Sequence, residues 1–481
     1  MKFSGFVGPS YTLRSINIDS QRCVNLYPET IESGKGKEGS VMSLQSAPGL
    51  TVLTTVGSGP IRGVHATAGG QLYVVSSNKL YEISSSWVAT EVGTLITSGG
   101  DVSMDDNGTT LMIVDGDNGY FNAMATNTFA QITDADFPGA DTVEFQDGYF
   151  IYNYPDSTGK FGISSLNATD PTDSFSALDF ATAEGSPDAI VGLISDHRDL
   201  YVFGSRTTEV YFNSGNADFP FERQQGAFIE HGCAATFSIA KMNNAVFWLG
   251  EDEYGDGIVY KAKGYEPQRI STHAVEEAIR GYASISDAKA FAYQQAGHYF
   301  YVINFTGANT TWVYDDTTGM WHERTHFTNG EEQRYRADNH AFAYNVHIAG
   351  DYFNSNLYKL DLDVFTDNGG ELIRERRTPH VSGGLNYIFH HKMQVDMEVG
   401  VGIDGSGQGD DPLIMMQFSD DGGLTWSNEK QASIGKIGER KVRAIWRRLG
   451  RARDRVYRVR ISDPVKVAII GAELDVSKGE S

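Results

Sequence analysis

An internal repeat constrains the fold of this chain more than any other feature of its sequence. Each copy contains an apolar strand, a turn with Gly, Asn or Asp, a second strand rich in Tyr, Phe and Val, and a third strand. Successive starts differ by 40, 40, 48, 48, 53 and 51 residues, and the seven starts are Ile61, Asp101, Asp141, Ala189, Phe237, Ala290 and Ala341. This spacing is close to the four-strand blade period of β-propellers, lengthened by insertions. We therefore predict an all-β chain with a seven-bladed β-propeller.

Two alternatives to seven blades remain open from the sequence. One is a propeller of six blades, and the other is a series of unrelated hairpins, because strand and turn recur in any all-β protein. The composition fits a turn-rich β protein, since 53 of the 481 residues are Gly and 26 Phe, 24 Tyr and 6 Trp give 56 aromatic residues. A single helix is predicted, with Thr272 as its N-cap and its end near Gly281.

The sequence changes in character near residue 375, where longer alternating strands begin. Such strands are typical of a separate β-sandwich-like domain, and they occupy residues 390–399, 412–418, 441–449 and 455–461. We expect three parts in the chain. Residues 1–60 form an N-terminal arm whose first strands close the propeller or dock, residues 61–374 form the propeller, and residues 375–481 form the C-terminal domain.

The chain is acidic, with a formal net charge of −23, but one segment is strongly basic. Between Lys430 and Lys466 there are 13 Lys or Arg residues and three acidic residues, so this segment carries +10 and the remainder −33. An acidic surface does not favour general nucleic-acid binding, which requires a basic footprint. We predict that the segment docks onto an acidic partner, which includes another copy of the chain, through Arg447, Arg448, Arg451 and Arg453. The alternatives are a solvated strand face and contact with DNA phosphates.

The segment SDDGGLTW fits the Asp-box pattern Ser-x-Asp-x-Gly-x-Thr-Trp in full. The Asp carboxylate can accept hydrogen bonds from turn N–H groups, the glycines permit positive φ, and the Trp can pack beneath the hairpin. Asp boxes are familiar from sialidases, but there the box lies away from the catalytic residues. We therefore interpret the five pattern residues as structural: Ser419, Asp421, Gly423, Thr425 and Trp426.

No constellation of residues in the sequence indicates catalysis or a bound cofactor. The loops at 115–119 and 404–412 lack positions that a calcium loop requires. His231 and Cys233 lie close together, but there is no second ligand pair for zinc. Neither a phosphate loop nor a nucleophile elbow occurs. We expect no enzymatic activity, no cofactor and no metal.

The sequence also bears on the compartment of the protein. There is no run of 18 apolar residues that predicts a membrane span, and the first ten residues lack the apolar segment of a signal peptide. The two cysteines, Cys23 and Cys233, exclude a disulfide framework. A reducing compartment such as the bacterial cytoplasm is therefore expected.

Several segments of the chain match a known family in order and spacing. They include RCVNLYPE at 22–29, HGCAATFSIAKMNNAVFWLG at 231–250, GYEPQRIST at 264–272, and WRRLGRARDRVYRVRISDP at 446–464. On these segments the sequence resembles the packaged-DNA stabilisation proteins of short-tailed bacteriophages, which form the tail hub or nozzle below the portal. The resemblance runs nearly from end to end.

This resemblance implies a structural protein of the virion tail with a β-propeller fold and without catalytic residues. Six copies would form a ring that extends the portal channel, retains the packaged DNA and conducts it during ejection, with double-stranded DNA only as transiting cargo. The implied partners are other copies of the chain, portal or head–tail adaptor proteins, and tail fibre, spike or needle proteins. Assembly would take place in the cytoplasm of the bacterial host. The alternative is a carbohydrate-binding or receptor-binding propeller of the tail.

Overall fold

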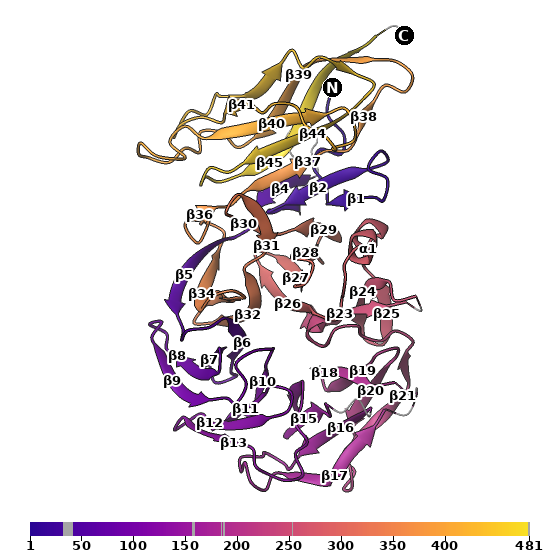
Figure 1. Cartoon of the computed structure of the whole chain (residues 1–481), viewed down its shortest axis with the longest axis vertical. Coiled ribbons are helices and arrows are strands. Elements are labelled where there is room, and N and C mark those ends of the chain that lie inside the picture. The colour runs from indigo at the N-terminus through magenta and orange to yellow at the C-terminus, as the bar shows by residue number, and fades with distance from the viewer. Residues whose placement is uncertain (32–41, 156–158, 184, 186–187, 253, 480–481) are drawn as a thin grey trace.

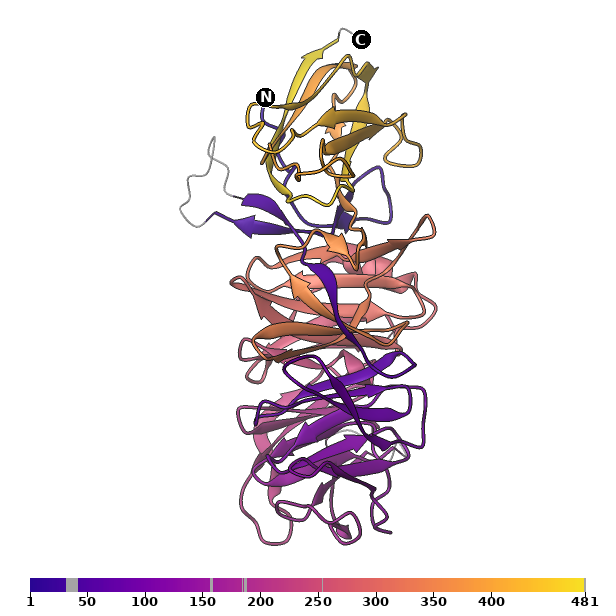
Figure 2. The same cartoon turned by 90° about the vertical axis from the view of Figure 1, so that its left-hand side faces the viewer.

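The computed structural model describes residues 1–31, 42–155, 159–183, 185, 188–252 and 254–479. They form a ring of β-sheet blades and a smaller body of strands at one edge of the ring (Figure 1). The first residues of the chain and the last strand, β45 (Ala468–Lys478), both lie in the smaller body, as two views at right angles show (Figures 1 and 2).

Six blades are each built from four strands that pair in chain order. The first two contain β6 (Ile61–Ala66), β7 (Leu72–Ser76), β8 (Lys79–Ile83), β9 (Ala89–Thr94), β10 (Ser103–Asp106), β11 (Thr110–Val114), β12 (Gly119–Ala123) and β13 (Thr128–Gln131). The next two contain β14 (Val143–Gln146), β15 (Tyr149–Asn153), β16 (Lys160–Ser164), β17 (Phe175–Thr182), β18 (Ile190–Asp196), β19 (Asp199–Gly204), β20 (Thr208–Asn213) and β21 (Phe221–Ile229). The fifth and sixth contain β22 (Ala240–Met242), β23 (Ala245–Glu251), β24 (Gly257–Lys263), β25 (Glu266–Arg269), β26 (Ala288–Gln295), β27 (His298–Phe305), β28 (Thr310–Asp315) and β29 (Met320–Glu323).

The seventh blade joins the two ends of the propeller sequence. Its first three strands are β32 (Ala337–Ala343), β33 (Val346–Asp351) and β34 (Asn356–Asp361), and its fourth is β5 (Gly49–Thr55) from near the N-terminus. β5 runs antiparallel to β34, with pairs from Asn356↔Thr55 to Asp361↔Gly49. The innermost strands form a closed series, because β6 contacts both β10 and β32. The prediction of seven blades is confirmed.

The core of the propeller is divided among the interfaces between blades. The middle strands are buried on both faces, as in β7 and β11, where every residue is buried. Between them Tyr73 and Val75 pack with Leu111 and Ile113. Each interface has an apolar cluster of this kind, so each blade depends on its two neighbours for a core.

The predicted helix is present as α1 (His273–Arg280), between the fifth and sixth blades. The Thr272 hydroxyl accepts a hydrogen bond from the Val275 N–H and thereby caps the helix, and Gly281 follows its last turn. Within the part of the chain that the structure describes, no helix has the length and apolar character needed to cross a membrane.

The smaller body is a β-sandwich, as predicted, and strands from both ends of the chain build it. One sheet contains β2 (Ser20–Val24), β37 (Arg374–Arg377), β44 (Asp454–Ile461), β40 (Leu413–Ser419) and β41 (Lys430–Ser433). The other contains β3 (Leu26–Thr30), β4 (Met42–Ser46), β45 (Ala468–Lys478), β39 (Ile388–Met397), β42 (Ala444–Arg447) and β43 (Arg451–Ala452). Buried side chains such as Met393, Ile414, Tyr457 and Leu474 fill the space between the sheets.

A continuous sheet links the sandwich to the propeller. β2 pairs in parallel with β29 of the sixth blade at Val24↔Glu323, and it pairs antiparallel with β37 on its other side. The Arg22 guanidinium forms an ion pair with Glu323 across this junction at 2.5 Å. The two bodies are therefore joined by hydrogen-bonded backbone as well as by the chain itself.

Candidate functional site

The four arginines of the predicted docking surface, Arg447, Arg448, Arg451 and Arg453, are all exposed on the sandwich. Three of them are brought together by a turn between β42 and β43, which both pair with β39. The turn places Arg448 at φ +59° and Gly450 at φ +80°. Glycine adopts this left-handed conformation without steric cost, so the turn can be tight.

Arg447, Arg448 and Arg451 line a hollow of about 600 Å³ together with Phe389 and His391. The Phe389 side chain is 39% exposed and forms an apolar part of the wall. Beside the hollow, the guanidinium carbons of Arg451 and Arg453 lie 4.7 and 4.8 Å from the centre of the Tyr387 ring. Tyr387, Phe389 and His391 were not identified from the sequence; the alternation of side chains along residues 388–397 is the signal that could have placed them on this face.

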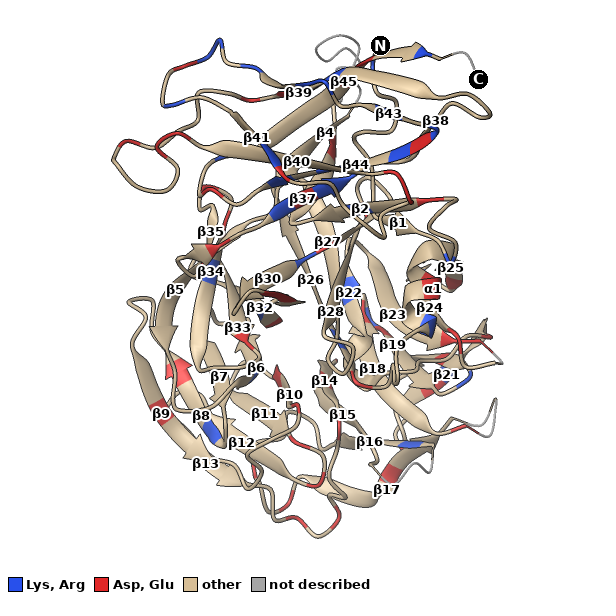
Figure 3. Cartoon of the chain, turned by 45° about the horizontal axis from the view of Figure 1, so that its top comes forward, with Lys and Arg blue, Asp and Glu red and all other residues tan. Residues whose placement is uncertain are grey.

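None of the four arginines forms an ion pair among the described residues. The ion pairs of the basic segment are made instead by Arg455 with Asp420, by Arg460 with Glu375, and by Lys436 and Lys466 with acids at the surface. Figure 3 shows Lys and Arg along β37 and β44 of the sandwich, whereas several blades carry Asp and Glu. The hollow thus offers positive charge that no carboxylate of the described residues pairs with.

One interpretation of the basic segment was a solvated strand face, and the arginines of β44 do not fit it. Arg455 is only 2% exposed, and its guanidinium donates to Asp420 at 2.6 Å. Arg460 donates to the buried Glu375 at 2.5 Å. The reason is topological: β44 lies between β37 and β40 in the sheet, so its polar side chains face neighbouring strands and the Asp-box hairpin.

The Asp box closes the loop after β40 through its own side chains. Asp421 accepts hydrogen bonds from the Thr425 N–H at 2.9 Å and from the Thr425 hydroxyl at 2.5 Å. The Ser419 hydroxyl donates to Asp421 at 2.6 Å and accepts from the Gly423 N–H at 2.7 Å, where Gly423 has φ +106°. Hydrogen bonds from Ser419 and Thr425 lower the pKa of Asp421.

Trp426 of the box lies in a different environment from the one expected. Its side chain is half-buried, and the guanidinium carbons of Arg458 and Arg377 lie 4.2 and 5.2 Å from the centre of its ring. The ring therefore packs against two cations of β44 and β37, and not against the apolar core beneath the hairpin.

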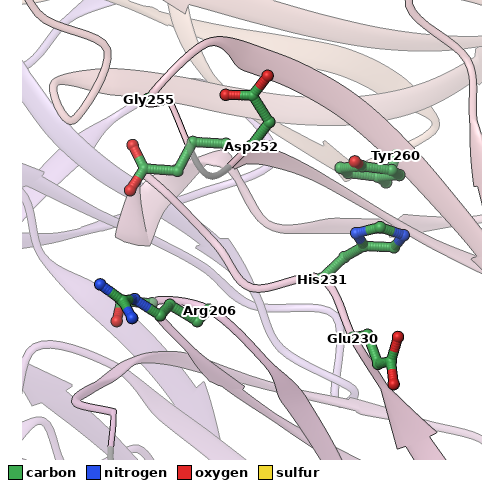
Figure 4. Close-up of a pocket in the computed structure, with 8 residues that line it drawn as sticks. Arg206, Glu230, His231, Asp252, Gly255 and Tyr260 are labelled. Carbon is green, nitrogen blue, oxygen red and sulfur yellow. The ribbon is translucent and has the colours of Figure 1, made fainter.

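A pocket of about 480 Å³ lies between the fourth and fifth blades (Figure 4). Its walls are formed by Ser205, Arg206, Glu230, His231, Glu251, Asp252, Gly255 and Tyr260. The Tyr260 ring is stacked with those of His231 and Trp248, at centroid distances of 4.4 and 5.6 Å. Cys233, close to His231 in sequence, is buried and directs its Sγ to the Ala235 carbonyl oxygen.

Within the described residues, one group has the composition of a metal site: His65, Asp105 and Asp106. The His65 Nε2 lies 2.9 Å from Asp106 Oδ2, which joins the first and second blades. Asp105 accepts from the Phe145 N–H at 2.6 Å and so joins the second and third. Burial and the nearby Glu144 raise the pKa of Asp105 to about 7. These contacts give the group a structural role between blades.

The centre of the propeller is a cavity of about 200 Å³, lined by residues of the inner strands. The Lys289 Nζ lies 2.5 Å from Asp101 and 3.4 Å from Asp338. Arg62 donates to carbonyl oxygens of residues 77, 97, 99 and 100 at the same centre. A space of this size admits a small cluster of water molecules. Duplex DNA cannot pass through it.

The similarity of the chain to solved structures is low. These structures include the computationally designed Ika8 protein (11% identity, TM-score 0.38, 74% of this chain and 100% of that one). The WD40 propeller domain of Doa1 is 12% identical, with a TM-score of 0.41 over 65% of this chain and 96% of that one. The extracellular domain of BT4673 from B. thetaiotaomicron is 10% identical, with a TM-score of 0.44 over 82% of this chain and 48% of that one. Similarity at this level says nothing about function.

Among curated proteins, none matches the chain. Two family models do match it, and together they cover nearly all of it. Residues 14–365 match the model described as "Bacteriophage P22 Gp10, beta-propeller", and residues 373–477 match "Bacteriophage P22 Gp10, beta-sandwich". The propeller and the sandwich occur in the same order in the structure. The chain therefore belongs to the bacteriophage P22 Gp10 family, the DNA-stabilisation proteins of short phage tails.

Proposed function

We propose that six copies of this chain form a ring in the virion tail that extends the portal channel, retains the packaged DNA and conducts it during ejection. The observation that carries this proposal is the match of both structural bodies, in order, to the phage family. The closed centre of the propeller supports it, because a passage for DNA then has to lie between copies. The chain acts in this proposal as a structural component without a catalytic step.

The charge of the chain is consistent with a DNA passage. Outside the segment 430–466 the chain carries a formal charge of −33, so most of its surface repels phosphate groups. Binding to DNA depends on releasing counterions with Lys and Arg, which an acidic wall does not do. DNA therefore passes such a wall without adhering to it.

The sandwich supplies the docking surface of the proposed ring. Arg447, Arg448 and Arg451 lie next to Phe389, and Arg453 lies beside Tyr387; all four are exposed and form no ion pair with a described carboxylate. An acidic surface of a neighbouring copy, or of a portal or adaptor protein, is complementary to these arginines. Attraction of this kind mainly speeds association and fixes orientation. Fibre, spike or needle proteins contact the remaining faces, and assembly takes place in the host cytoplasm.

Electron microscopy of the particle tests the ring. Tails viewed along their axis should show sixfold density that fits the propeller and the sandwich, continuous with the portal channel. The purified chain, alone and mixed with portal–adaptor complexes, should give a hexameric mass on the complex by native mass spectrometry. A different stoichiometry, or a monomer bound at the side of the tail, would contradict the proposal.

A double charge reversal tests the docking surface. Because the Arg447 and Arg448 side chains are exposed, Arg447→Glu with Arg448→Glu should leave the chain folded but stop tail completion, so that filled heads release their DNA. In vitro assembly in a salt series is the measurement, since attraction between wild-type surfaces weakens as the Debye length falls to about 3 Å at 1 M salt.

The matched control for this test is Arg14→Glu with Lys263→Glu. Both residues are exposed and lie outside the hollow, and the change in net charge is the same. Normal assembly of the control together with failed assembly of the Arg447 and Arg448 variant supports docking. Normal tails from both variants at low salt would leave these arginines as a solvated face.

A further inference from the structure

One arginine is buried in the propeller without a carboxylate. Arg324 follows β29 in the sixth blade and is 0% exposed. Its Nε, Nη1 and Nη2 atoms have no hydrogen-bond partner among the described residues, and no ion pair includes it there. A buried charge is costly unless an opposite charge or hydrogen bonds compensate for it. This position therefore requires an explanation.

Aromatic rings surround the guanidinium of Arg324, but at long range. Its central carbon lies 5.1 Å from the centre of the Phe300 ring and 5.5 Å from those of Tyr293 and Tyr335. Stacked pairs elsewhere in the chain are closer, at 3.6 Å for Arg334 over Tyr352. The rings thus contribute some cation–π stabilisation and leave the guanidinium without a tight stacking partner.

The other polar groups around Arg324 are also without partners. Both ring nitrogens of His322 and the hydroxyls of Tyr293 and Tyr335 are buried and form no hydrogen bond with a described residue. Burial and then Arg324 hold the pKa of His322 well below its usual value, so the ring is neutral. Burial raises the pKa of Tyr335, so its hydroxyl keeps its proton. Each of these groups offers at least one N–H or O–H donor.

Arg324 itself stays charged, and nearby carboxylates are otherwise engaged. Burial alone would lower the pKa of Arg324, but Tyr293 and Tyr335 raise it above its ordinary value. In the same blade Asp315 accepts from His298 at 2.7 Å and from the Thr318 hydroxyl at 2.9 Å. The result is one buried positive charge that forms no ion pair with a carboxylate among the described residues, and whose polar neighbours are the neutral His322 ring and the hydroxyls of Tyr293 and Tyr335.

We propose that a small monovalent anion of the halide class binds beside Arg324. It would accept hydrogen bonds from the guanidinium, from the hydroxyls of Tyr293 and Tyr335, and from the N–H of His322. A single negative charge balances the buried cation. Because Tyr335 precedes β32 of the seventh blade and the other groups belong to the sixth, the anion would tie together the blades on either side of the ring closure.

Halide-dependent unfolding of the full chain tests this site. A ligand that binds only the folded state stabilises it in proportion to the logarithm of its concentration. At constant ionic strength, each tenfold replacement of gluconate by chloride or bromide should raise the melting temperature of the propeller by about 1–3 °C. Equal melting temperatures in halide and gluconate would overturn the proposal.

Two tyrosine variants separate the site from general salt effects. Tyr335→Phe keeps the ring and removes one donor, so the halide response should shrink. Tyr152→Phe also removes a buried hydroxyl, in the third blade, and should retain the full response. Equal responses from the two variants would contradict the site.

Crystals grown in bromide give a direct test. An anomalous peak within hydrogen-bond distance of the Arg324 guanidinium is the expected result. Ordered water at this position without anomalous signal would overturn the proposal.

Discussion

The propeller and the sandwich are built from strands that lie at very different distances in the sequence. Within six blades, the four strands pair in the order in which they follow one another in the chain. In the sandwich, Leu44 pairs with Ile469, and the Leu474 N–H donates to the Met1 carbonyl oxygen. Within its blades the propeller contains one distant strand pair, β5 with β34, whereas several pairs of the sandwich join the two ends of the chain. Local pairing leaves a visible period in a sequence, and distant pairing does not.

The two bodies also differ in how they place charge. In the centre of the propeller, the Lys289 ammonium is paired with Asp101 and Asp338, although Arg324 of the sixth blade is buried without a carboxylate partner among the described residues. In the sandwich, Arg447, Arg448 and Arg451 line a hollow on the outside and form no ion pair with a described carboxylate. Balanced charges stabilise a fold, and unbalanced exposed charges are available to a partner. This contrast is the physical basis for assigning the docking role to the sandwich.

The largest expected effect comes from opening the ring at its one distant contact. Leu50 of β5 is 2% exposed in the cluster at the seventh blade. Leu50→Asp removes this packing and buries an unpaired charge, so the free energy of unfolding should fall by about 4–5 kcal/mol. Urea titration monitors the loss.

The matched control lies two residues further along β5. Val52 is 38% exposed, and Val52→Asp should change the free energy of unfolding by less than about 0.5 kcal/mol. Equal effects of the two substitutions would show that β5 does not close the propeller in solution.

The next effect concerns Arg455, one of the buried arginines of the sandwich. The Arg455 guanidinium donates hydrogen bonds to the Asp420 carboxylate and to the Leu449 carbonyl oxygen. Arg455→Met keeps the volume but leaves a buried acceptor unpaired, and we expect a loss of about 2–3 kcal/mol. Arg453→Met, on the exposed neighbour, should be nearly neutral. If thermal unfolding gave the reverse order, the inward and outward assignment of these arginines would be wrong.

Sequence reasoning succeeded where the signal was local. The repeat starts at Ile61 and Ala189 lie at or next to the first residues of β6 and β18, and the Thr272 cap starts α1. Each of these signals comes from interactions between residues that are close together in the sequence. The participation of β2 and β4 in the sandwich gave no such signal, because β37 and β45, with which they pair there, lie more than 300 residues away.

The candidate site was predicted only in part. Charge counting identified Arg447 and Arg451, because Lys and Arg clusters are visible without structure. The same count included Arg455 and Arg460, which lie within the sheet, since counting charges does not show which strand is central. Phe389 was not identified because it comes from β39, about 60 residues before the arginines that it joins.

The pH dependence of stability should distinguish a buried histidine of the sandwich from an exposed one at its surface. His390 is 2% exposed, and its Nδ1 lies 2.7 Å from the Tyr457 hydroxyl. Burial, with Arg455 nearby, lowers the pKa of His390 to about 4. Its folded pKa lies below the unfolded value of about 6.5, so its contribution is complete above pH 6.5 and is lost as the pH falls towards 4. Because of this group, the free energy of unfolding from urea titrations should be about 2–3 kcal/mol lower at pH 4.5 than at pH 7.

The neighbouring histidine is the control for this measurement. His391 is exposed and bonded to the Ser477 hydroxyl. His390→Gln should reduce the pH dependence between pH 6.5 and 4 by this amount, with the other buried histidines still contributing, and His391→Gln should leave it as in the parent chain. A flat profile for the parent chain would contradict the assignment.

The smallest effect is expected at the Asp box, whose carboxylate lies at the surface. Asp421→Asn weakens the hydrogen bonds to Thr425 and Ser419, so the melting temperature of the sandwich should fall slightly at pH 7. These bonds lower the pKa of Asp421, so the contribution of the ionised group is present above pH 4 and is lost as the pH falls below that value. Parent and variant should therefore converge in acid, whereas Asp404→Asn, at an exposed loop position of the same body, should match the parent at every pH. A constant difference between parent and Asp421→Asn from pH 7 to pH 2 would mean that the shape of the loop, and not the charge of Asp421, stabilises the hairpin.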